Sequence, residues 1–330
     1  MQPKVTIISG YFNRESYVKE SLDSLISQTY SNLEIIVFDD SSTDNTYKRL
    51  LEYQHQDSRI KVIRNETNKG FVNTLIEIFT GIQSEYIAIH GSGDISAPDR
   101  IQKQVEFLMS FPDYGLIGTG YKKQDGKAHP LIFKTITTSD LIKRNHLAHG
   151  SVMFKLDTYR KAGGYRSFFN HVQDRDLWLR MSLITKIGVL PEVLYKITTI
   201  EKSDTVSRNI AKVVQQILLS KFACEQIQIR KKFGYDLLDK YGDKAGLFFD
   251  ARKINISILK MLMIQFYQGK TNNYLFLITT LKNINRNVLS EILIRFVEQL
   301  YSNPLTRKSI VKILKMYFKE RKFSNYKELI

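Results

Sequence analysis

Among the acidic side chains of the first 180 residues, those at three places could do chemistry, each beside a strand-like or helical pattern. Asp39 and Asp40 end one buried-strand pattern, Asp94 follows another, and Asp174 stands at the start of a helical pattern. One such carboxylate could hydrogen-bond a base or ribose, and another could hold a divalent cation on a diphosphate. A third could act as general base on a hydroxyl group. Together they predict displacement at a carbon that carries a nucleotide diphosphate leaving group.

Strand and helix patterns alternate through the first hundred residues and would bring these carboxylates together. Apolar runs of strand length alternate with stretches whose apolar residues repeat at helical spacing. The alternation predicts an α/β fold with a mostly parallel, doubly wound sheet. Ligands bind such sheets beyond the carboxyl ends of the strands. The predicted strands are Val5–Ser9, Leu33–Phe38, Ile60–Arg64 and Tyr86–Ile89, and the predicted helices are Glu15–Gln28, Thr46–Tyr53, Phe71–Phe79 and one that begins at Pro98.

The pattern changes in the second half of the chain. The middle of the chain is less regular, apart from a helical pattern at Asp174–Thr185. Beyond Asp204 the sequence consists of long helical patterns rich in Lys, Ile and Leu. We therefore place a domain boundary near residue 207, which gives an α/β domain over residues 1–207 and an α-helical C-terminal domain over residues 208–330.

Charge is distributed unevenly between these two parts. The chain of 330 residues carries 49 Lys and Arg against 33 Asp and Glu, a net charge of +16. Residues 1–204 hold 26 basic and 24 acidic residues, so residues 205–330 carry +14 of that charge. Such an excess predicts an anionic partner for the C-terminal part.

Each acidic residue also has a purely structural interpretation. Asp39 and Asp40 could cap the helix that follows them. Asp174 could be the N-cap of its own helix, and Asp176 could interact with the helix dipole in the first turn. The sequence has no Gly-rich dinucleotide fingerprint after the first strand and no P-loop, which removes two common nucleotide-binding classes.

Seven segments occur in an order that is typical of one enzyme family. Phe38–Asp44 is close to the pattern v-D-D-g-S-x-D, and Gln173–Arg180 is close to E-D-x-D-L-W-L-R. Over residues 4 to about 207 the chain resembles the family 2 glycosyltransferases, an inverting group with the GT-A fold. The resemblance implies a Rossmann-like, mostly parallel sheet flanked by helices. The other matching segments are Val5–Asn13, Ser24–Tyr30, Asn68–Gly70, Gly150–Phe154 and Gly163–Tyr165.

The resemblance implies a role for each candidate residue. Tyr11 would stack on the base, Asp40 would hydrogen-bond it and so favour uridine, and Lys69 would lie near the diphosphate. Asp94 would coordinate Mg²⁺ or Mn²⁺. Asp174 would deprotonate an acceptor hydroxyl for inverting attack at the anomeric carbon. The residues implied to bind the nucleotide sugar are Ser9, Tyr11, Asp39, Asp40 and Lys69.

The chain departs from the family pattern around the expected cation. Gly91–Asp94 reads G-S-G-D where relatives have D-a-D-D, and Tyr195–Thr198 replaces Y-R-v-H, which removes a potential His ligand. Gln173 also replaces a Glu. Fewer carboxylates should weaken the cation site. The alternative function is therefore a nucleotide-sugar-binding pseudoenzyme or an assembly subunit with a degenerate metal site.

The expected acceptor and location follow from the resemblance and from the charge. The resemblance implies transfer from a UDP-sugar to a hydroxyl of a glycan or lipid-linked glycan in surface polysaccharide synthesis, of the capsule or O-antigen type. The basic C-terminal helices could simply be solvated, but the favoured partner is an anionic membrane surface. Nucleic acid is disfavoured because no nucleic-acid-binding motif accompanies the charge. A single cysteine, Cys224, and the lack of a leader or spanning run predict a cytoplasmic protein at the inner membrane face.

Overall fold

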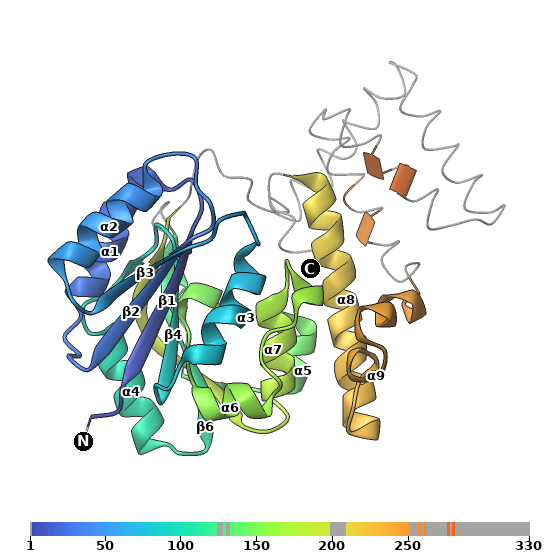
Figure 1. Cartoon of the computed structure of the whole chain (residues 1–330). Helices are drawn as coiled ribbons and strands as arrows, with labels where there is room; N and C mark the ends of the chain where they lie inside the picture. Colours follow the sequence, from blue (N-terminus) through green and yellow to red (C-terminus); the bar gives the residue numbers. More distant parts are fainter. Residues whose placement is uncertain are drawn as a thin grey trace, which may run out of the picture. The chain divides into compact units, whose positions relative to one another are not determined.

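The chain divides into two compact units, Met1–Ser203 and Asp204–Ile330, drawn in Figure 1. The structure is a computed structural model that describes residues 2–123, 128–129, 133–198 and 209–250, and residues 257–258, 261, 276–277 and 279–280. The boundary predicted near residue 207 lies outside the described residues, as does most of the predicted C-terminal domain beyond residue 250. That division into domains stays a prediction.

The first unit is built on one ten-stranded sheet. The strand order is β3-β2-β1-β4-β9-β6-β10-β5, with β7 paired to β6 and β8 paired to β10. The strands are β1 (Val5–Tyr11), β2 (Leu33–Asp39), β3 (Ile60–Arg64), β4 (Tyr86–Gly91), β5 (Ile95–Ser96), β6 (Tyr114–Lys123), β7 (Ala128–His129), β8 (Lys134–Ile136), β9 (Met153–Lys155) and β10 (Lys186–Ile197).

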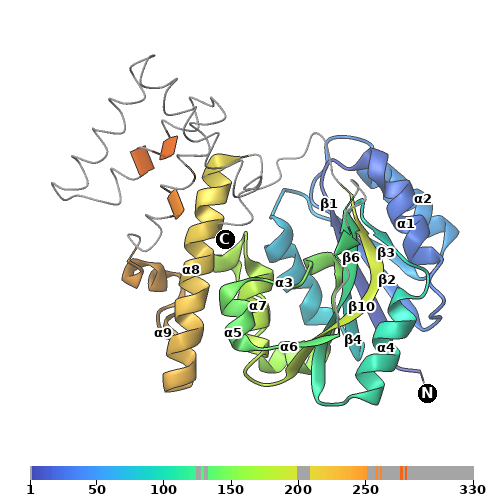
Figure 2. The same cartoon turned by 180° about the vertical axis from the view of Figure 1, so that it is seen from behind.

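Helices cover both faces of this sheet. Figures 1 and 2 show α1, α2 and α4 on one face and α3, α6 and α7 on the other. Short 3₁₀ turns, η1 (Glu15–Tyr17), η2 (His149–Ser151) and η3 (Ser167–Phe169), lie between them in the chain. The helices are α1 (Val18–Ile26), α2 (Thr46–Gln56), α3 (Phe71–Gly81), α4 (Arg100–Ser110), α5 (Thr138–Lys143), α6 (Leu156–Lys161) and α7 (Gln173–Met181).

The first four strands form the parallel part of the sheet, as the sequence predicts. β1 pairs in parallel with β2 and with β4, and β2 pairs in parallel with β3. Val5 and Ile7 of β1 pack with Leu22 and Leu25 of α1 and with Ile101 of α4, and all five side chains are fully buried. Because these strands run in register, their carboxyl ends reach one edge of the sheet together.

The second half of the sheet is mixed in direction. β9 pairs antiparallel with β4 and β6, whereas the long strand β10 pairs in parallel with β6 and antiparallel with the short strand β5. The pairing with β5 sets Tyr195 of β10 opposite Ser96. This pairing therefore brings the end of β10, around Tyr195, next to the segment that follows β4.

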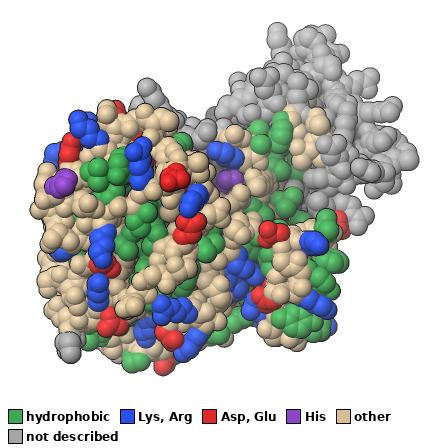
Figure 3. Space-filling view, in the orientation of Figure 1, with side chains coloured by type: hydrophobic (Ala, Val, Ile, Leu, Met, Phe, Trp, Pro, Cys, Tyr) green, Lys and Arg blue, Asp and Glu red, His purple; other side chains and the backbone are tan. Residues whose placement is uncertain are grey.

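Basic and acidic side chains are interspersed on the surface of the first unit that Figure 3 shows. Several of them are paired: Lys103 lies 2.9 Å from Asp99 and 3.6 Å from Glu192, and Lys161 lies 2.7 Å from Asp157. Exposed pairs of this kind contribute little stability each. They agree with the near-neutral charge of this part of the sequence.

The described part of the second unit is helical. It contains α8 (Ile210–Phe233), α9 (Leu237–Tyr241) and the 3₁₀ turn η5 (Gly242–Phe248). Asn209 caps α8, and Gly234 ends it with a left-handed φ of 81°. Within the described residues, no helix is both long enough and apolar enough to cross a membrane.

Candidate active site

The loops after β1 and β2 are joined at the carboxyl edge of the sheet. The N–H of Asn13 donates to Ser42 Oγ at 2.9 Å, and the N–H of Thr43 donates to Asn13 Oδ1 at 2.8 Å. Asn13 and Ser41 adopt positive φ values of 52° and 65°. Asn tolerates this left-handed conformation better than most residues. The two loops are therefore held together at the corner of the sheet edge where the sequence predicts the nucleotide to bind.

Asp40 holds a third loop against this corner. Its Oδ1 accepts hydrogen bonds from Asn65 Nδ2 at 2.8 Å and from the N–H of Lys69 at 2.9 Å, and its Oδ2 accepts one from the N–H of Gly70 at 2.9 Å. The carboxylate thus fixes the segment between β3 and α3. One lone pair of Oδ2 stays available for a donor on a ligand, such as the N–H of a base.

Asp39 lies deeper than Asp40 and is fully buried. Its Oδ2 accepts a hydrogen bond from the N–H of Ser42 at 3.1 Å and lies 3.8 Å from Arg64 Nε. Its Oδ1 has no hydrogen-bond partner among the described residues. Leaving a buried carboxylate oxygen without a hydrogen bond costs free energy. This atom can therefore accept a hydrogen bond from a water or a ligand.

Ser9 and Tyr11, at the end of β1, have buried side chains, and their predicted contact with the nucleotide stays a prediction. Ser9 is fully buried and Tyr11 is 1% exposed, with its hydroxyl donating to Ser21 Oγ at 3.1 Å. Burial raises the pKa of Tyr11 to about 12. Phe12, the next residue, is 43% exposed and is the ring that a base could reach. Strand alternation gives the signal: if Tyr11 points into the core, its neighbour points out.

Lys69 contributes its backbone to this corner. Its side-chain Nζ lies 2.8 Å from a carboxylate oxygen of Glu77, which is in α3. Its N–H donates to Asp40. A diphosphate would have to compete with Glu77 for the ammonium group, which is partly exposed and therefore able to move.

Asp94 stands beyond β4 and is held by two donors. The Tyr195 hydroxyl donates to its Oδ2 at 2.7 Å, and the N–H of Thr198 donates to its Oδ1 at 2.9 Å. Burial raises the pKa of Asp94 to about 6, although these two hydrogen bonds and the charge of Arg100 oppose the rise. The carboxylate is thus fixed in orientation, and no Lys or Arg among the described residues forms an ion pair with it.

A buried cation lies beneath Asp94. Arg100 is fully buried and donates to Ser96 Oγ at 2.8 Å and to the carbonyl of Ile89 at 2.9 Å. Burial lowers the pKa of Arg100 to about 10. Burial and the Arg100 charge together lower the pKa of His90 to about 3, so His90 is neutral. Its Nε2 lies 3.0 Å from the Asp94 carbonyl oxygen, which makes this nitrogen the donor to the turn.

The residues around Asp94 fit a divalent cation that takes most of its ligands from elsewhere. Within the described residues, no group of three or more His, Cys, Asp or Glu side chains could hold a metal ion. Thr198 Oγ1 is buried and has no hydrogen-bond partner among the described residues. A carboxylate and a hydroxyl are the hard oxygen donors that Mg²⁺ and Mn²⁺ prefer. Mg²⁺ commonly keeps several waters and binds substrate phosphates, which a site with few protein ligands requires.

Asp174 lies in the first turn of α7. Val172 occupies the N-cap position and makes no side-chain cap bond, so Asp174 does not cap the helix. Asn145 Nδ2 donates to Asp174 Oδ2 at 2.8 Å. The carboxylate is therefore oriented by a neutral amide, which suits a group that accepts a proton.

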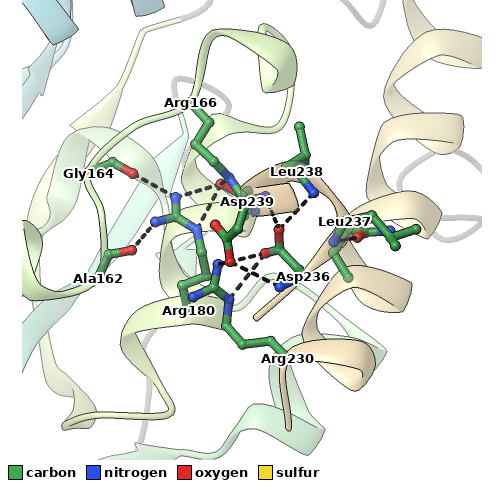
Figure 4. A network of polar contacts seen from close by, with 11 residues as sticks. Ala162, Gly164, Arg166, Arg180, Arg230, Asp236, Leu237, Leu238 and Asp239 are labelled. Carbon is green, nitrogen blue, oxygen red and sulfur yellow. Dashed lines mark hydrogen bonds and ion pairs between the residues drawn. The ribbon is translucent and has the colours of Figure 1, made fainter. Parts of the chain in front are cut away.

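Asp176 locks α7 to the turn that precedes it. Its carboxylate accepts hydrogen bonds from Arg166 and Arg180. Arg180 also donates to the carbonyls of Ala162 and Gly164, as Figure 4 shows. Burial alone would raise the pKa of Asp176, but the two arginines hold it below its usual value. Asp176 is thus a structural carboxylate, which orients the helix that carries Asp174.

The turn η2 connects these corners. A Cβ built on Gly150 would lie 2.1 Å from the Tyr195 hydroxyl, so this residue lies directly against the group that holds Asp94. His149 Nε2 lies 2.8 Å from the Tyr165 hydroxyl, and its ring lies 5.8 Å from that of Phe71, which begins α3 after the loop that Asp40 holds. Asp174 acts on His149 electrostatically, although burial lowers the pKa of His149 overall. The turn η2 therefore lies against the tyrosine that holds Asp94, and its His149 is close enough to Asp174 to be affected by that charge.

The mixed α/β sheet with helices on both faces is the GT-A fold of glycosyltransferases, as its likeness to solved structures shows. Residues 6–163 match the family model described as "Glycosyl transferase family 2". The chain is 34% identical over 235 residues to "Putative glycosyltransferase EpsE" of Bacillus subtilis (strain 168), which covers 69% of this chain and 84% of that protein. The chain belongs to glycosyltransferase family 2 and is a glycosyltransferase, as its sequence predicts.

Other similar proteins show the same fold and class. The chain is 30% identical over 188 residues to the O-antigen biosynthesis glycosyltransferase WbnJ of Escherichia coli, across 54% of this chain and 71% of that one. The crystal structure of S. aureus TarS 1-349 in complex with UDP-GlcNAc gives a TM-score of 0.61 at 16% identity, over 96% of this chain and 92% of that one. The mannosyltransferase PcManGT from Pyrobaculum calidifontis, in complex with GDP-Man and Mn²⁺, gives 0.56 at 14% identity, over 95% and 85%.

Proposed function

We propose that this glycosyltransferase moves a sugar from a UDP-sugar to a hydroxyl of a glycan or lipid-linked glycan during surface polysaccharide synthesis, with inversion at the anomeric carbon. The names of similar proteins support the process: one acts in O-antigen biosynthesis and another, TuaG, in teichuronic acid biosynthesis. The TarS complex with UDP-GlcNAc supports the donor class.

The nucleotide binds at the joined loops of β1 and β2. Phe12 offers its exposed ring to the base, while Ser9 and Tyr11 form the buried wall beneath. Asp40 accepts a base N–H through the remaining lone pair of Oδ2, and the buried Oδ1 of Asp39 is a second acceptor. This set requires a donor N–H on the ligand, which the imide of uracil supplies.

The diphosphate lies toward Asp94. Asp94 would hold Mg²⁺ or Mn²⁺, with the Thr198 hydroxyl as the neighbouring oxygen donor. When bound, such a cation neutralises the charge that develops on the departing diphosphate. Lys69 can turn from Glu77 toward the same oxygens. The second alternative, a binding protein without activity, rests on the missing carboxylates at residues 91 and 93.

Asp174 is the general base, and the observation that carries this role is its contact with Asn145. The neutral amide orients the carboxylate and leaves Oδ1 available apart from a local contact with its own helix. The carboxylate takes the proton of the acceptor hydroxyl as that oxygen forms a bond to the anomeric carbon. The bond from the anomeric carbon to the diphosphate breaks on the opposite face, and the nucleoside diphosphate leaves with the electron pair.

The test compares Asp174→Asn with Asp157→Asn, a change at an exposed acid on α6. We expect Asp174→Asn to lower kcat for sugar transfer by roughly 10²–10⁴-fold, because that is the usual contribution of a positioned base. UDP affinity, measured by calorimetry, should stay within about twofold for both variants. Full turnover by Asp174→Asn would remove this residue as the base. If the wild-type protein binds UDP but transfers nothing across a panel of UDP-sugars and acceptors, the binding-protein alternative holds instead.

A further inference from the structure

The sequence lacks a carboxylate at residue 91, and the space around that residue is already filled. We infer that Tyr195 is a positioning residue for Asp94, and that Gly91 and Gly150 have no side chains because the Tyr195 hydroxyl and the Asp94 carboxylate occupy their places. The inference rests on the proposed function, in which Asp94 faces the diphosphate. It makes G-S-G-D a rebuilt site rather than a degenerate one.

The Tyr195 hydroxyl bridges two parts of the turn that carries Asp94. It donates to Asp94 Oδ2 at 2.7 Å and accepts a hydrogen bond from the N–H of Gly91 at 2.9 Å. The N–H of Asp94 donates back to the carbonyl of Gly91 at 3.0 Å. With Thr198 on Oδ1, both carboxylate oxygens have a fixed donor. Tyr195 thus ties β10 to Gly91 at the end of β4, 104 residues away in the chain.

The two glycines leave no room for a side chain. A Cβ on Gly91 would lie 2.3 Å from Asp94 Oδ2 and 3.3 Å from the Tyr195 hydroxyl. A Cβ on Gly150 would lie 2.1 Å from the Tyr195 hydroxyl and 2.8 Å from its Cζ. These distances are far inside van der Waals contact. Any larger residue at position 91 or 150 must displace the tyrosine or the carboxylate.

Tyr195 cannot move aside easily. It is 2% exposed, and its ring meets His90 edge-on at 5.5 Å with 80° between the planes. The Arg100 guanidinium lies 5.0 Å from the centre of the same ring. A side chain at residue 91 would therefore push Asp94 out of position.

The first experiment measures UDP affinity by calorimetry with and without Mn²⁺ for the full chain. We expect Tyr195→Phe to reduce the Mn²⁺-dependent gain in UDP affinity by about tenfold or more, since partners that orient a metal ligand have effects of this size. Gly91→Asp, which restores the family carboxylate, should also lose that gain. Affinity without Mn²⁺ should change less than about threefold. A gain equal to or above wild type in either variant overturns the inference.

Two variants serve as matched controls. Tyr114→Phe, at the start of β6, removes a hydroxyl that lies 2.7 Å from Thr135 Oγ1. Gly81→Ala, in α3, adds a Cβ that has no other atom within 4 Å. Both should bind UDP like wild type. If wild-type affinity for UDP is the same with and without Mn²⁺, the cation role of Asp94 in the proposed function fails, and the next measurement alone decides the positioning of Asp94.

The second experiment measures melting temperatures and needs no ligand. Gly91→Ala should lower the melting temperature by roughly 3–6 °C, because its Cβ meets Asp94 Oδ2. In an Asp94→Ala background, the same change should cost at most half as much, because the colliding carboxylate is gone. An equal cost in both backgrounds overturns the inference whether or not the protein binds UDP.

Discussion

The carboxylates of this site differ in the donors that hold them. Asp94 is held by the Tyr195 hydroxyl and Asp174 by the Asn145 amide, whereas Asp176 is held by two arginines. A neutral donor orients a carboxylate without neutralising its charge, so Asp94 and Asp174 can still attract a cation or a proton. Two guanidinium groups satisfy Asp176 completely. Contact chemistry thus separates the two acids that we propose to act in the reaction from the structural one.

Phe12 is the residue-scale feature that the sequence analysis missed. We predict that Phe12→Ala weakens UDP binding by about tenfold, because stacking of a base on an aromatic ring contributes roughly 1–3 kcal/mol. The melting temperature should hardly change, since the ring is 43% exposed. Phe133→Ala, which removes a ring that is 45% exposed in another aromatic cluster, is the matched control. Unchanged UDP affinity in Phe12→Ala would mean that the base binds elsewhere and does not stack on this ring.

Helix α7 and the glycine turn before it form one positioned element. Gly163 and Gly164 have positive φ values of 83° and 66°, and the Gly164 carbonyl accepts a hydrogen bond from Arg180. Arg180 and Arg166 then converge on Asp176 within α7. The position of Asp174, the proposed general base, depends on this element, although none of these groups needs to touch a substrate.

Asp176→Asn should therefore destabilise the protein without changing the UDP affinity of the molecules that remain folded. We expect a loss of about 3–5 kcal/mol at neutral pH, because removing one partner of a buried ion pair leaves the others uncompensated. The folded-state pKa of Asp176 is lowered, so its stabilisation is complete above the unfolded pKa of about 3.9 and is lost as pH falls through the lower folded value. The difference in melting temperature between wild type and Asp176→Asn should thus shrink below about pH 4. A difference that is the same at pH 7 and at pH 3.5 would contradict an ionic role.

Elements with local patterns could be predicted from the sequence, and elements set by distant pairing could not. The order of β1 to β4 and their helices follows from apolar periodicity, and it carries Asp39, Asp40 and Asp94 to one edge. The twelve-residue strand β10 was not foreseen, because its pairing partners β5, β6 and β8 are far away in the chain. Without β10 the contact between Tyr195 and Asp94 could not be predicted. The sequence at Gly91 therefore indicated only the loss of carboxylate ligands.

At the scale of the whole molecule, charge separates the two parts of the chain. The first 204 residues are nearly neutral, and residues 205–330 carry +14. We propose that this basic part binds an anionic membrane surface, where each Lys or Arg contributes about 1 kcal/mol. Such binding would also hold the enzyme near a lipid-linked acceptor. The sequence supplies the charge, and the described helices give no segment that could span a bilayer.

Flotation of the full chain with lipid vesicles tests this electrostatic attraction. We expect binding to vesicles that contain anionic lipid, little binding to neutral vesicles, and release as salt shortens the screening length. Changing Lys312, Lys315, Lys319 and Lys322 to Gln, all outside the described residues, should weaken binding by at least about tenfold. The matched control changes four exposed lysines of the first unit to Gln: Lys19, Lys61, Lys161 and Lys186. Both quadruple variants lose four positive charges, so a general effect of charge would weaken their vesicle binding equally. Only a stronger loss of binding in the C-terminal variant assigns membrane binding to the basic part of the chain.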